Sequence, residues 1–567
     1  MEAKYRKAVA PFVVLVMVAV IWHKTGIYFE TNDDRCITEI LCGRMTGAPQ
    51  ARTIYVSYLL ALPISWLYRI VPKVPWFGLT LILFQILAYT AVLESICSRC
   101  RKIWQMAAGT VFTGTALLLN LYMLGRIQYT ATAGLLAAAG YFCLLAHADA
   151  KSGWIRFFVL ELLAGMLRSN AMLMMQPMGF LTVGGVLMAR QDVPLRKRLA
   201  LMGKALLPPV AVFLVISAVS TFVYRGNDWK AYMKFLDSQV ELFDYEGLPP
   251  YDEVRDILEK YQVSETGYRA YADYMMLDWI LPPECAEELT AYVREREIPR
   301  DIAGVWEELR KQLFEESYWG WNRALAFLWA AVVILALLWR KMSLLFPAAG
   351  LLAGKMICWG FLVYQGRLPL RVSLPLLAGE MLLLSALILN CGAEMEPSGN
   401  RKRMRDLGTA AFLLGMCVVG FLSGKQQYSY VLSTNNGQKI FMEGLREIRA
   451  YCDARPENRY VLDAISMSYY TGSALESEIY EKSNYIVSGN WYSNSPHLRS
   501  YNAGYLSGNE GFYYLVYDDG RGLEHPCVSY LIQETGAEPE ICDRFTASHG
   551  GAYLVYYFDG AYHIEES

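Results

Sequence analysis

Long apolar runs recur along the sequence and alternate with short polar loops. The runs Val9 to Trp22, Ala205 to Tyr224 and Ala324 to Trp339 each supply most or all of the roughly 20 residues that a helix needs to cross a bilayer. This pattern excludes a single soluble domain, a disordered chain and a disulfide scaffold. It predicts an α-helical polytopic membrane protein with about eleven spans, near residues 9–27, 75–97, 103–123, 133–148, 155–168, 171–189, 205–224, 322–339, 343–363, 372–390 and 407–424.

One further apolar stretch, Thr53 to Val71, decides the orientation of everything that follows it. Pro63 interrupts the stretch, and Arg52 and Arg69 lie at its two ends, which suits a helix at the membrane surface better than a full span. If it does not cross, most short-loop cations share a side with the N-terminus, and the positive-inside rule makes that side cytoplasmic. These cations are Lys4, Arg6, Lys7, Arg99, Arg101, Lys102, Lys151, Arg156, Arg190, Arg196, Lys197, Arg198, Lys204, Arg340, Lys341, Arg401, Lys402, Arg403 and Arg405.

The same orientation puts the long polar segments outside. We expect a multi-pass protein of the plasma membrane, with a cytoplasmic N-terminus and an outer C-terminal domain. Strand and helix patterns alternate in the last segment, which indicates a small α/β domain. The predicted domains are a membrane module over 1–224 with juxtamembrane helices at 33–43 and 53–71, an outer helical loop domain over 225–321, C-terminal spans over 322–424 and an outer α/β domain over 425–567.

Composition narrows the function classes. Charged residues make up only 19% of the chain, and 52 Lys and Arg against 54 Asp and Glu leave a net charge of −2, which gives no reason to expect nucleic acid as a partner. The 12 cysteines are scattered, and the 6 histidines show no spacing typical of a zinc hydrolase, so no metal ligands are assigned. No phosphate-binding Walker loop or G-x-S-x-G elbow occurs in the sequence.

The most informative local feature is the acidic pair Asp33 and Asp34, directly after the first span. Ile37, Ile40 and Leu41 follow at helical spacing, which predicts a short amphipathic helix on the outer leaflet. The two carboxylates can simply cap this helix and interact with its dipole. Alternatively, a carboxylate held at the membrane surface can take a proton from an acceptor while a lipid-linked donor lies beside it.

This arrangement resembles the GT-C superfamily of integral-membrane glycosyltransferases, and most of all its protein-mannosyltransferase and lipid A aminoarabinose-transferase group. The resemblance rests on the acidic dyad, on Arg35 and the Glu39-Ile40 pair in the juxtamembrane helix, and on the second juxtamembrane helix, 53–71. A short outer loop between the third and fourth spans and a soluble outer C-terminal domain also match. The resemblance implies a polyprenyl-phosphate-linked sugar as donor, and a lipid, glycan or protein as acceptor.

Carried over by position, the family's acceptor-activating acid falls on Asp33, with Asp34 as its neighbour and substitute. Arg52, at the head of the second juxtamembrane helix, falls where a cation meets the lipid phosphate. Family members commonly have another acid after the third span, whereas this chain has Gly125 to Thr130, with Arg126 as a further phosphate ligand. The missing acid leaves the role of a divalent metal open, and no other cofactor is expected.

A few arginines on the predicted outer face run against the charge bias. Arg367 and Arg371 lie in a loop of only a few residues between two spans, and Arg168 lies at the outer hinge between two short spans. An arginine there either binds two oxygens of the phosphate of a lipid donor or extends to the lipid headgroups. Aromatic side chains such as Trp491 can likewise stack on sugars or simply pack.

The leading hypothesis is therefore a cell-envelope glycosyltransferase with Asp33 as general base. Two alternatives from other classes stay open. One is a transporter or polymerase-like protein for lipid-linked glycans, which requires a polar path through the spans. The other is a non-catalytic scaffold of the same architecture, whose outer domain binds a cell-wall polymer.

Overall fold

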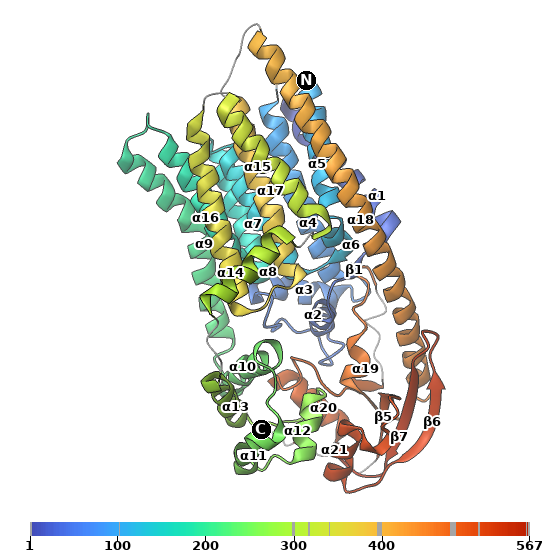
Figure 1. Cartoon of the computed structure of the whole chain (residues 1–567). Coiled ribbons are helices and arrows are strands. Elements are labelled where there is room, and N and C mark those ends of the chain that lie inside the picture. Colours follow the sequence, from blue (N-terminus) through green and yellow to red (C-terminus); the bar gives the residue numbers. More distant parts are fainter. Residues whose placement is uncertain are drawn as a thin grey trace.

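The computed structural model describes residues 3–100, 103–296, 301–315, 318–338, 341–393, 400–476, 484–507, 511–562 and 564. Figure 1 shows two parts: a bundle of long helices and, at one end of it, an extramembrane unit of short helices and a sheet. We use the name extramembrane unit for the described residues of 227–296 and 455–562. Helix α18 (Asn400–Asp453) runs along the bundle and continues into this unit. The predicted inner cations Arg101, Lys102 and Arg340 lie outside the described residues.

Six helices of the described chain are long and apolar enough to cross a membrane, and shorter apolar helices accompany them. The central one, α7, is buried along its whole length, because α8 and α17 pack on it. The predicted mostly helical membrane architecture is confirmed, whereas the number of spans stays a prediction. Besides α18, the bundle contains α1 (Ala3–Thr25), α4 (Trp76–Arg99), α5 (Ile103–Leu119), α6 (Leu121–Gly125), α7 (Tyr129–Ala146), α8 (Lys151–Ala189), α9 (Leu195–Val223), α15 (Trp321–Leu338), α16 (Leu345–Gln365) and α17 (Leu370–Ala393).

Helix α8 consists of two antiparallel halves. Arg168 has a non-helical backbone (φ −159°, ψ 98°) in the middle of its 39 residues. Gln176 Nε2 donates to Glu161 Oε2 at 3.1 Å, although a straight helix would separate residues 15 apart by about 22 Å. At the other end of the two halves, Arg190 Nη1 contacts Asp149 Oδ1 at 2.8 Å. The two short helices expected at 155–168 and 171–189 are therefore both present, with Arg168 at the turn between them.

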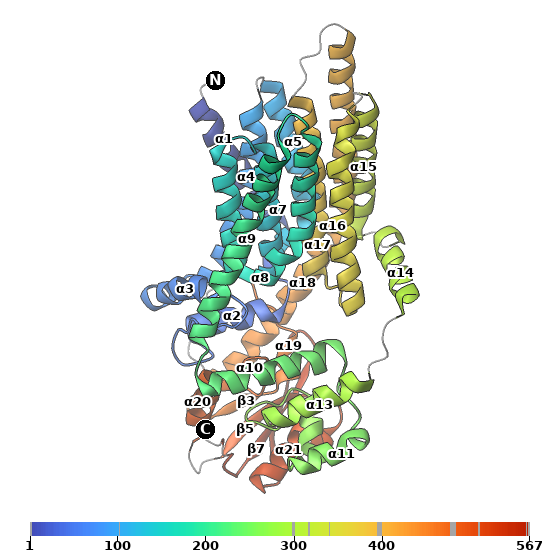
Figure 2. The same ribbon diagram turned by 90° about the vertical axis from the view of Figure 1, so that its left-hand side faces the viewer.

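Two short helices lie where the bundle meets the extramembrane unit. Helix α3 (Tyr58–Ile70) spans about 20 Å, too short to cross roughly 30 Å of hydrocarbon, and it projects sideways in Figure 2. Trp66 and Ile70 on it are 58% and 74% exposed, as expected for a helix that lies at the membrane surface. Strands β1 (Tyr28–Phe29) and β2 (Arg126–Ile127) pair in parallel beside these helices.

Helix α2 (Asn32–Cys42) differs from its predicted setting on the leaflet surface, because protein covers both of its sides. Ile37 and Leu41 belong to the hydrophobic cluster that includes α3 and α4. Cys36 and Ile40 belong to the cluster formed with the extramembrane unit. The helix ends at Gly43, whose φ of 84° favours glycine. The apolar residues of α2 thus serve two packing surfaces instead of one membrane-facing stripe.

The extramembrane unit combines segments that are far apart in the sequence. Its sheet has the order β4-β3-β5-β7-β6; β3 is parallel to β4 and β5, and β7 is antiparallel to β5 and β6. Phe235 and Leu289 share one hydrophobic core with Val461 and Tyr514. The two polar segments therefore fold together. The sheet strands are β3 (Tyr460–Leu462), β4 (Tyr485–Val487), β5 (Phe512–Tyr517), β6 (Glu540–Thr546) and β7 (Ala552–Phe558).

The remaining short helices lie around this sheet or beside the bundle. Figure 2 shows α14 apart from the other helices of its segment, alongside the bundle, where it packs against α16. The helices are α10 (Asn227–Val240), η1 (Glu241–Tyr245), α11 (Tyr251–Lys260), α12 (Glu265–Ala272), α13 (Pro283–Arg296), α14 (Ile302–Arg310), η2 (Lys311–Glu315), η3 (Tyr318–Gly320), η4 (Met342–Leu344), α19 (Ala464–Ser468), α20 (Pro496–Leu506), η6 (Gly522–Glu524) and α21 (Pro526–Thr535).

Thiol labelling of intact cells tests the predicted orientation. Cys542 is exposed on β6, so a membrane-impermeant maleimide should label it from outside, and Cys542→Ser should remove that label. A cysteine introduced at the exposed Asp192, at the far end of the bundle, should react in the Cys542→Ser background only after the membrane is permeabilised. The reverse pattern would overturn the orientation derived from the charges.

Candidate active site

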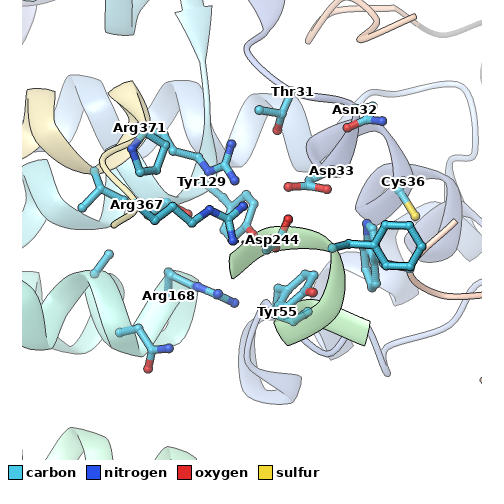
Figure 3. A pocket seen from close by; sticks show the side chains of 18 of the residues that line it. Thr31, Asn32, Asp33, Cys36, Tyr55, Tyr129, Arg168, Asp244, Arg367 and Arg371 are labelled. Atoms are coloured by element: carbon cyan, nitrogen blue, oxygen red, sulfur yellow. Dashed lines mark ion pairs between the residues drawn. The ribbon is translucent and has the colours of Figure 1, made fainter. Parts of the chain in front are cut away.

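A cavity of about 1200 Å³ lies where the bundle meets the extramembrane unit. Its walls come from α2, the turn of α8, the loop between α16 and α17, the end of α10 with η1, and residues 464–470 and 487–491. Figure 3 shows Asp33 in this cavity with Asp244 and three arginines, Arg168, Arg367 and Arg371. Segments separated by more than 300 residues thus contribute charged side chains to one space.

Asp33 lies in the first turn of α2 and its carboxylate points into the cavity (Figure 3). Burial raises the pKa of this carboxyl, and the neighbouring Asp244 raises it further. The positive charges of Arg371, Arg168 and Arg367 lower the same pKa, but the net direction is upward. A carboxylate with a raised pKa accepts a proton more readily than an ordinary aspartate at the same pH, which suits a general base.

Asp34 has a different role in the structure. Its side chain is fully buried, Oδ1 accepts from the backbone N–H of Tyr129 at 3.0 Å, and Oδ2 accepts from the Thr31 hydroxyl at 3.1 Å. It does not line the cavity. Nor do the carboxylates cap the helix, because the N-cap is Thr31, which makes no side-chain capping bond. Asp34 therefore ties α2 to the start of α7, and Asp33 alone of the pair faces the cavity.

Four arginines of the described ranges line the cavity, and two of them have close ionic partners. Arg35 Nε donates to Glu39 at 2.9 Å, and Arg367 Nη1 lies 2.5 Å from Asp244 Oδ2. Arg168 lies over the Tyr55 ring, with its guanidinium carbon 4.6 Å from the ring centroid. Among the described residues, Arg168 and Arg371 have no carboxylate within ion-pair distance, so these two cations remain for an anion such as phosphate.

Two predicted phosphate ligands lie elsewhere. Arg52 lines a separate cavity of about 510 Å³ beside Trp229, and its Nη1 lies 3.1 Å from His497 Nε2. Arg126 is buried and donates through Nη2 to the carbonyl of Glu30 at 3.0 Å. Neither residue lines the cavity of Asp33. The pairing of β1 with β2 holds Arg126 against the Glu30 backbone, and the fold around α10 holds Arg52 beside Trp229.

Asp244 is the acidic residue that the sequence did not reveal. It belongs to η1, in the middle of a polar segment with several other acids, so no local pattern distinguishes it. Trp491, by contrast, lines the cavity as one of the aromatic residues singled out from the sequence, with its ring 4.6 Å from that of Tyr55. Asn490 and Gln239 add amide groups to the lining, which suit the hydroxyls of a sugar.

The charged groups of the cavity fit an anion better than a resident divalent cation. Asp244 is already paired with Arg367, and Arg371 faces Asp33 (Figure 3). Within the described ranges, no group of three metal-ligating side chains lines this cavity. Asp33 and the arginines are therefore the charged groups of this cavity that can act on a bound ligand.

Comparisons with known proteins give a distant similarity. No protein-family profile matches the sequence, and no curated protein does. The fold is similar to the crystal structure of ArnT from Cupriavidus metallidurans bound to undecaprenyl phosphate, with a TM-score of 0.37, 12% identity, and coverage of 98% of this chain and 99% of that chain. For the same protein in the apo state the TM-score is 0.39 and the identity 11%, over 99% of both chains. At this distance the similarity assigns no function to the chain.

We expect the Asp34 side chain to stabilise the folded protein. Asp34→Ala removes the acceptor for the Tyr129 N–H and the Thr31 hydroxyl, and a buried group left without its partner costs about 1–3 kcal/mol. We expect a lower Tm for Asp34→Ala in a thiol-reactive dye assay in detergent, and an unchanged Tm for the matched variant Asp33→Asn. Equal melting of Asp34→Ala and the unmodified protein would contradict the anchoring role.

Proposed function

We propose that this chain is a membrane glycosyltransferase, which moves a sugar from a polyprenyl-phosphate donor to an acceptor on the outer face of the membrane. The observation that supports this most is the shared cavity of Asp33, Arg168 and Arg371, at the boundary between the apolar bundle and the extramembrane unit. The cavity holds a base beside two arginines that have no close carboxylate partners, and it lies at a membrane boundary. This combination suits a reaction in which a lipid phosphate is the leaving group. The polyprenyl-phosphate donor class is inferred from the resemblance of the sequence to the GT-C superfamily.

The walls of the cavity offer an apolar side and a side that carries polar groups, which suits an amphiphilic donor. Toward the bundle, α8, α16 and α17 line it with apolar residues, among them Met174, Phe361 and Leu376. Ile357 and Phe361 are 54% and 50% exposed, so this side is open at the level of the bundle, where a polyprenyl chain can enter. Toward the extramembrane unit the lining also contains the amides of Asn490 and Gln239, and this side receives the sugar and the acceptor.

In the proposed step, an acceptor hydroxyl or amine attacks the anomeric carbon in line with the bond to the phosphate oxygen. The new bond joins the acceptor atom to the anomeric carbon, and the bond from that carbon to the phosphate oxygen breaks with its electron pair staying on oxygen. Asp33 takes the proton of the acceptor. Arg371 and Arg168 stabilise the charge that develops on the departing lipid phosphate. Inversion at the anomeric carbon is expected from the resemblance.

Asp33→Asn tests the base directly. An amide cannot accept the proton, so transfer should fall by about 10²- to 10⁴-fold while expression and Tm stay unchanged. The assay incubates purified protein with a panel of polyprenyl-phosphate sugars and follows donor consumption by mass spectrometry. Asp192→Asn, an exposed substitution at the opposite end of the bundle, is the matched control and should retain activity. Full activity of Asp33→Asn would remove this mechanism.

The pH profile tests the link between Arg371 and Asp33. Transfer requires deprotonated Asp33, so kcat/KM should rise as pH increases through its pKa. Arg371 lowers that pKa, and Arg371→Gln should therefore raise it and move the acid limb of kcat/KM upward by about one pH unit. Arg371→Lys keeps the charge and should leave the limb near its original position. An unshifted acid limb of kcat/KM in Arg371→Gln would show that Arg371 does not influence the pKa of Asp33.

A further inference from the structure

A second group of reactive side chains lies in the extramembrane unit. Asp273, His525 and Cys527 each place one potential ligand atom within 4.8 Å of the others. Asp273 directly follows α12, His525 is the N-cap residue of α21, and Cys527 lies in the first turn of α21. His525 is 5% exposed and Cys527 is fully buried, whereas Asp273 is half-buried and leaves a way in from the surface.

The imidazole of this group has an unsatisfied ring nitrogen. His525 Nδ1 is buried and has no hydrogen-bond partner in the described part of the chain. A buried polar nitrogen without a partner is costly and rare in folded proteins. Cys527 forms no disulfide; its thiol shares a hydrogen bond with the Tyr514 hydroxyl and lies 3.9 Å from the carbonyl oxygen of Asp273. A bound cation would supply the partner that the imidazole lacks.

The charges around the group favour a cation. Asp519 lies at its edge, with Oδ2 4.0 Å from His525 Nε2, and Asp463 adds a further negative charge to the surroundings of His525 and Cys527. Arg521 is the opposing charge: its Nη2 lies 3.4 Å from Asp273 Oδ2, and its Nε lies 2.6 Å from Asp519 Oδ2. The three acids outnumber this one arginine, whose shorter contact is to Asp519.

We propose that Asp273, His525 and Cys527 bind one zinc-like divalent cation, with Asp519 close enough to complete the site. One carboxylate, one imidazole and one thiolate are the donor types that zinc prefers. Ligand atoms of a tetrahedral zinc site are about 3.3–3.8 Å apart, so the side chains need to close by about 1 Å. On binding, the Cys527 S–H bond breaks, the sulfur bonds to the metal, and the proton goes to solvent.

The position of the site suggests what the cation does. It joins the end of α12 to the start of α21, two segments 254 residues apart in the sequence. The residue after Asp273 is Tyr274, which lines the cavity of Asp33. Met276, two residues further, donates its backbone N–H to Ser488 at 2.8 Å, next to the cavity wall formed by residues 487–491. The cation would therefore hold one wall of the cavity, away from the reacting groups.

Cobalt binding to the whole protein tests this site without any assay of transfer. The full chain, purified in detergent through a tag that contains no histidine, is stripped with EDTA and titrated with Co²⁺. A thiolate-to-cobalt charge-transfer band should appear and saturate at one equivalent, and zinc should displace it. The band should vanish in Cys527→Ser and persist in Cys542→Ser, which removes the exposed cysteine of β6 and serves as the matched control.

Two results of the cobalt titration would overturn the proposal. One is the absence of saturable binding by the unmodified protein, and the other is an unchanged band in Cys527→Ser or His525→Gln. Because a substitution in this core can impair folding, the unmodified protein supplies a second readout: EDTA should lower its Tm, and stoichiometric Zn²⁺ should restore it. A Tm that responds to neither would also count against the site. Failure of this binding leaves the role of Asp33 untouched, since the two sites share no ligand.

Discussion

The candidate site depends on how helix α2 is held. Eleven residues are packed between the bundle and the extramembrane unit, with Ile37 and Leu41 against one and Cys36 and Ile40 against the other. The bond from the Tyr129 N–H to Asp34 fixes the start of the helix on α7. With these contacts in place, the carboxylate of the preceding residue, Asp33, points into the cavity.

Buried charge around α2 strengthens this arrangement. Arg35 bonds both Glu39 and the carbonyl oxygen of Tyr470, which ties the helix to the extramembrane unit. Arg35, Arg44 and Arg449 outweigh the effect of burial and hold the pKa of the Glu39 carboxyl below its ordinary value. Because each partner is deeply buried, loss of one would leave an uncompensated charge. The network therefore favours a single position of α2, and with it a single position of Asp33.

The cations of the cavity come from places where the backbone turns. Arg168 lies at the turn of the α8 hairpin, and Arg367 and Arg371 lie in and just after the connection between α16 and α17. An arginine in such a position avoids the hydrocarbon and reaches polar surroundings. The pairing of Arg367 with Asp244 neutralises one of these charges, which leaves Arg168 and Arg371 to act on a ligand. The extramembrane unit, through Asp244, thus adjusts the charge of a site that the bundle begins.

The sequence by itself determined the elements that the bilayer imposes. A span must be long and apolar. Composition and length therefore predicted the helices of the bundle, the short helix α3 and the two halves of α8. The sequence also indicated Asp33, Arg367 and Arg371 as candidate site residues, because each charge lies beside an apolar run. For Asp33 the expectation rested on its place after the first span and on a resemblance, and its role in transfer stays a proposal.

Only the tertiary structure decided which of these charges meet. Asp34 and Asp33 are equivalent in sequence, yet the packing of α2 on α7 buries one and exposes the other to the cavity. Arg52 and Arg126 have the same local signal as Arg371 but lie outside this cavity. No local sequence pattern indicates Asp244. The same holds for the grouping of Asp273 with His525 and Cys527. The physical reason is that partitioning into the bilayer acts on each apolar segment separately, whereas such sites arise from contacts between segments hundreds of residues apart.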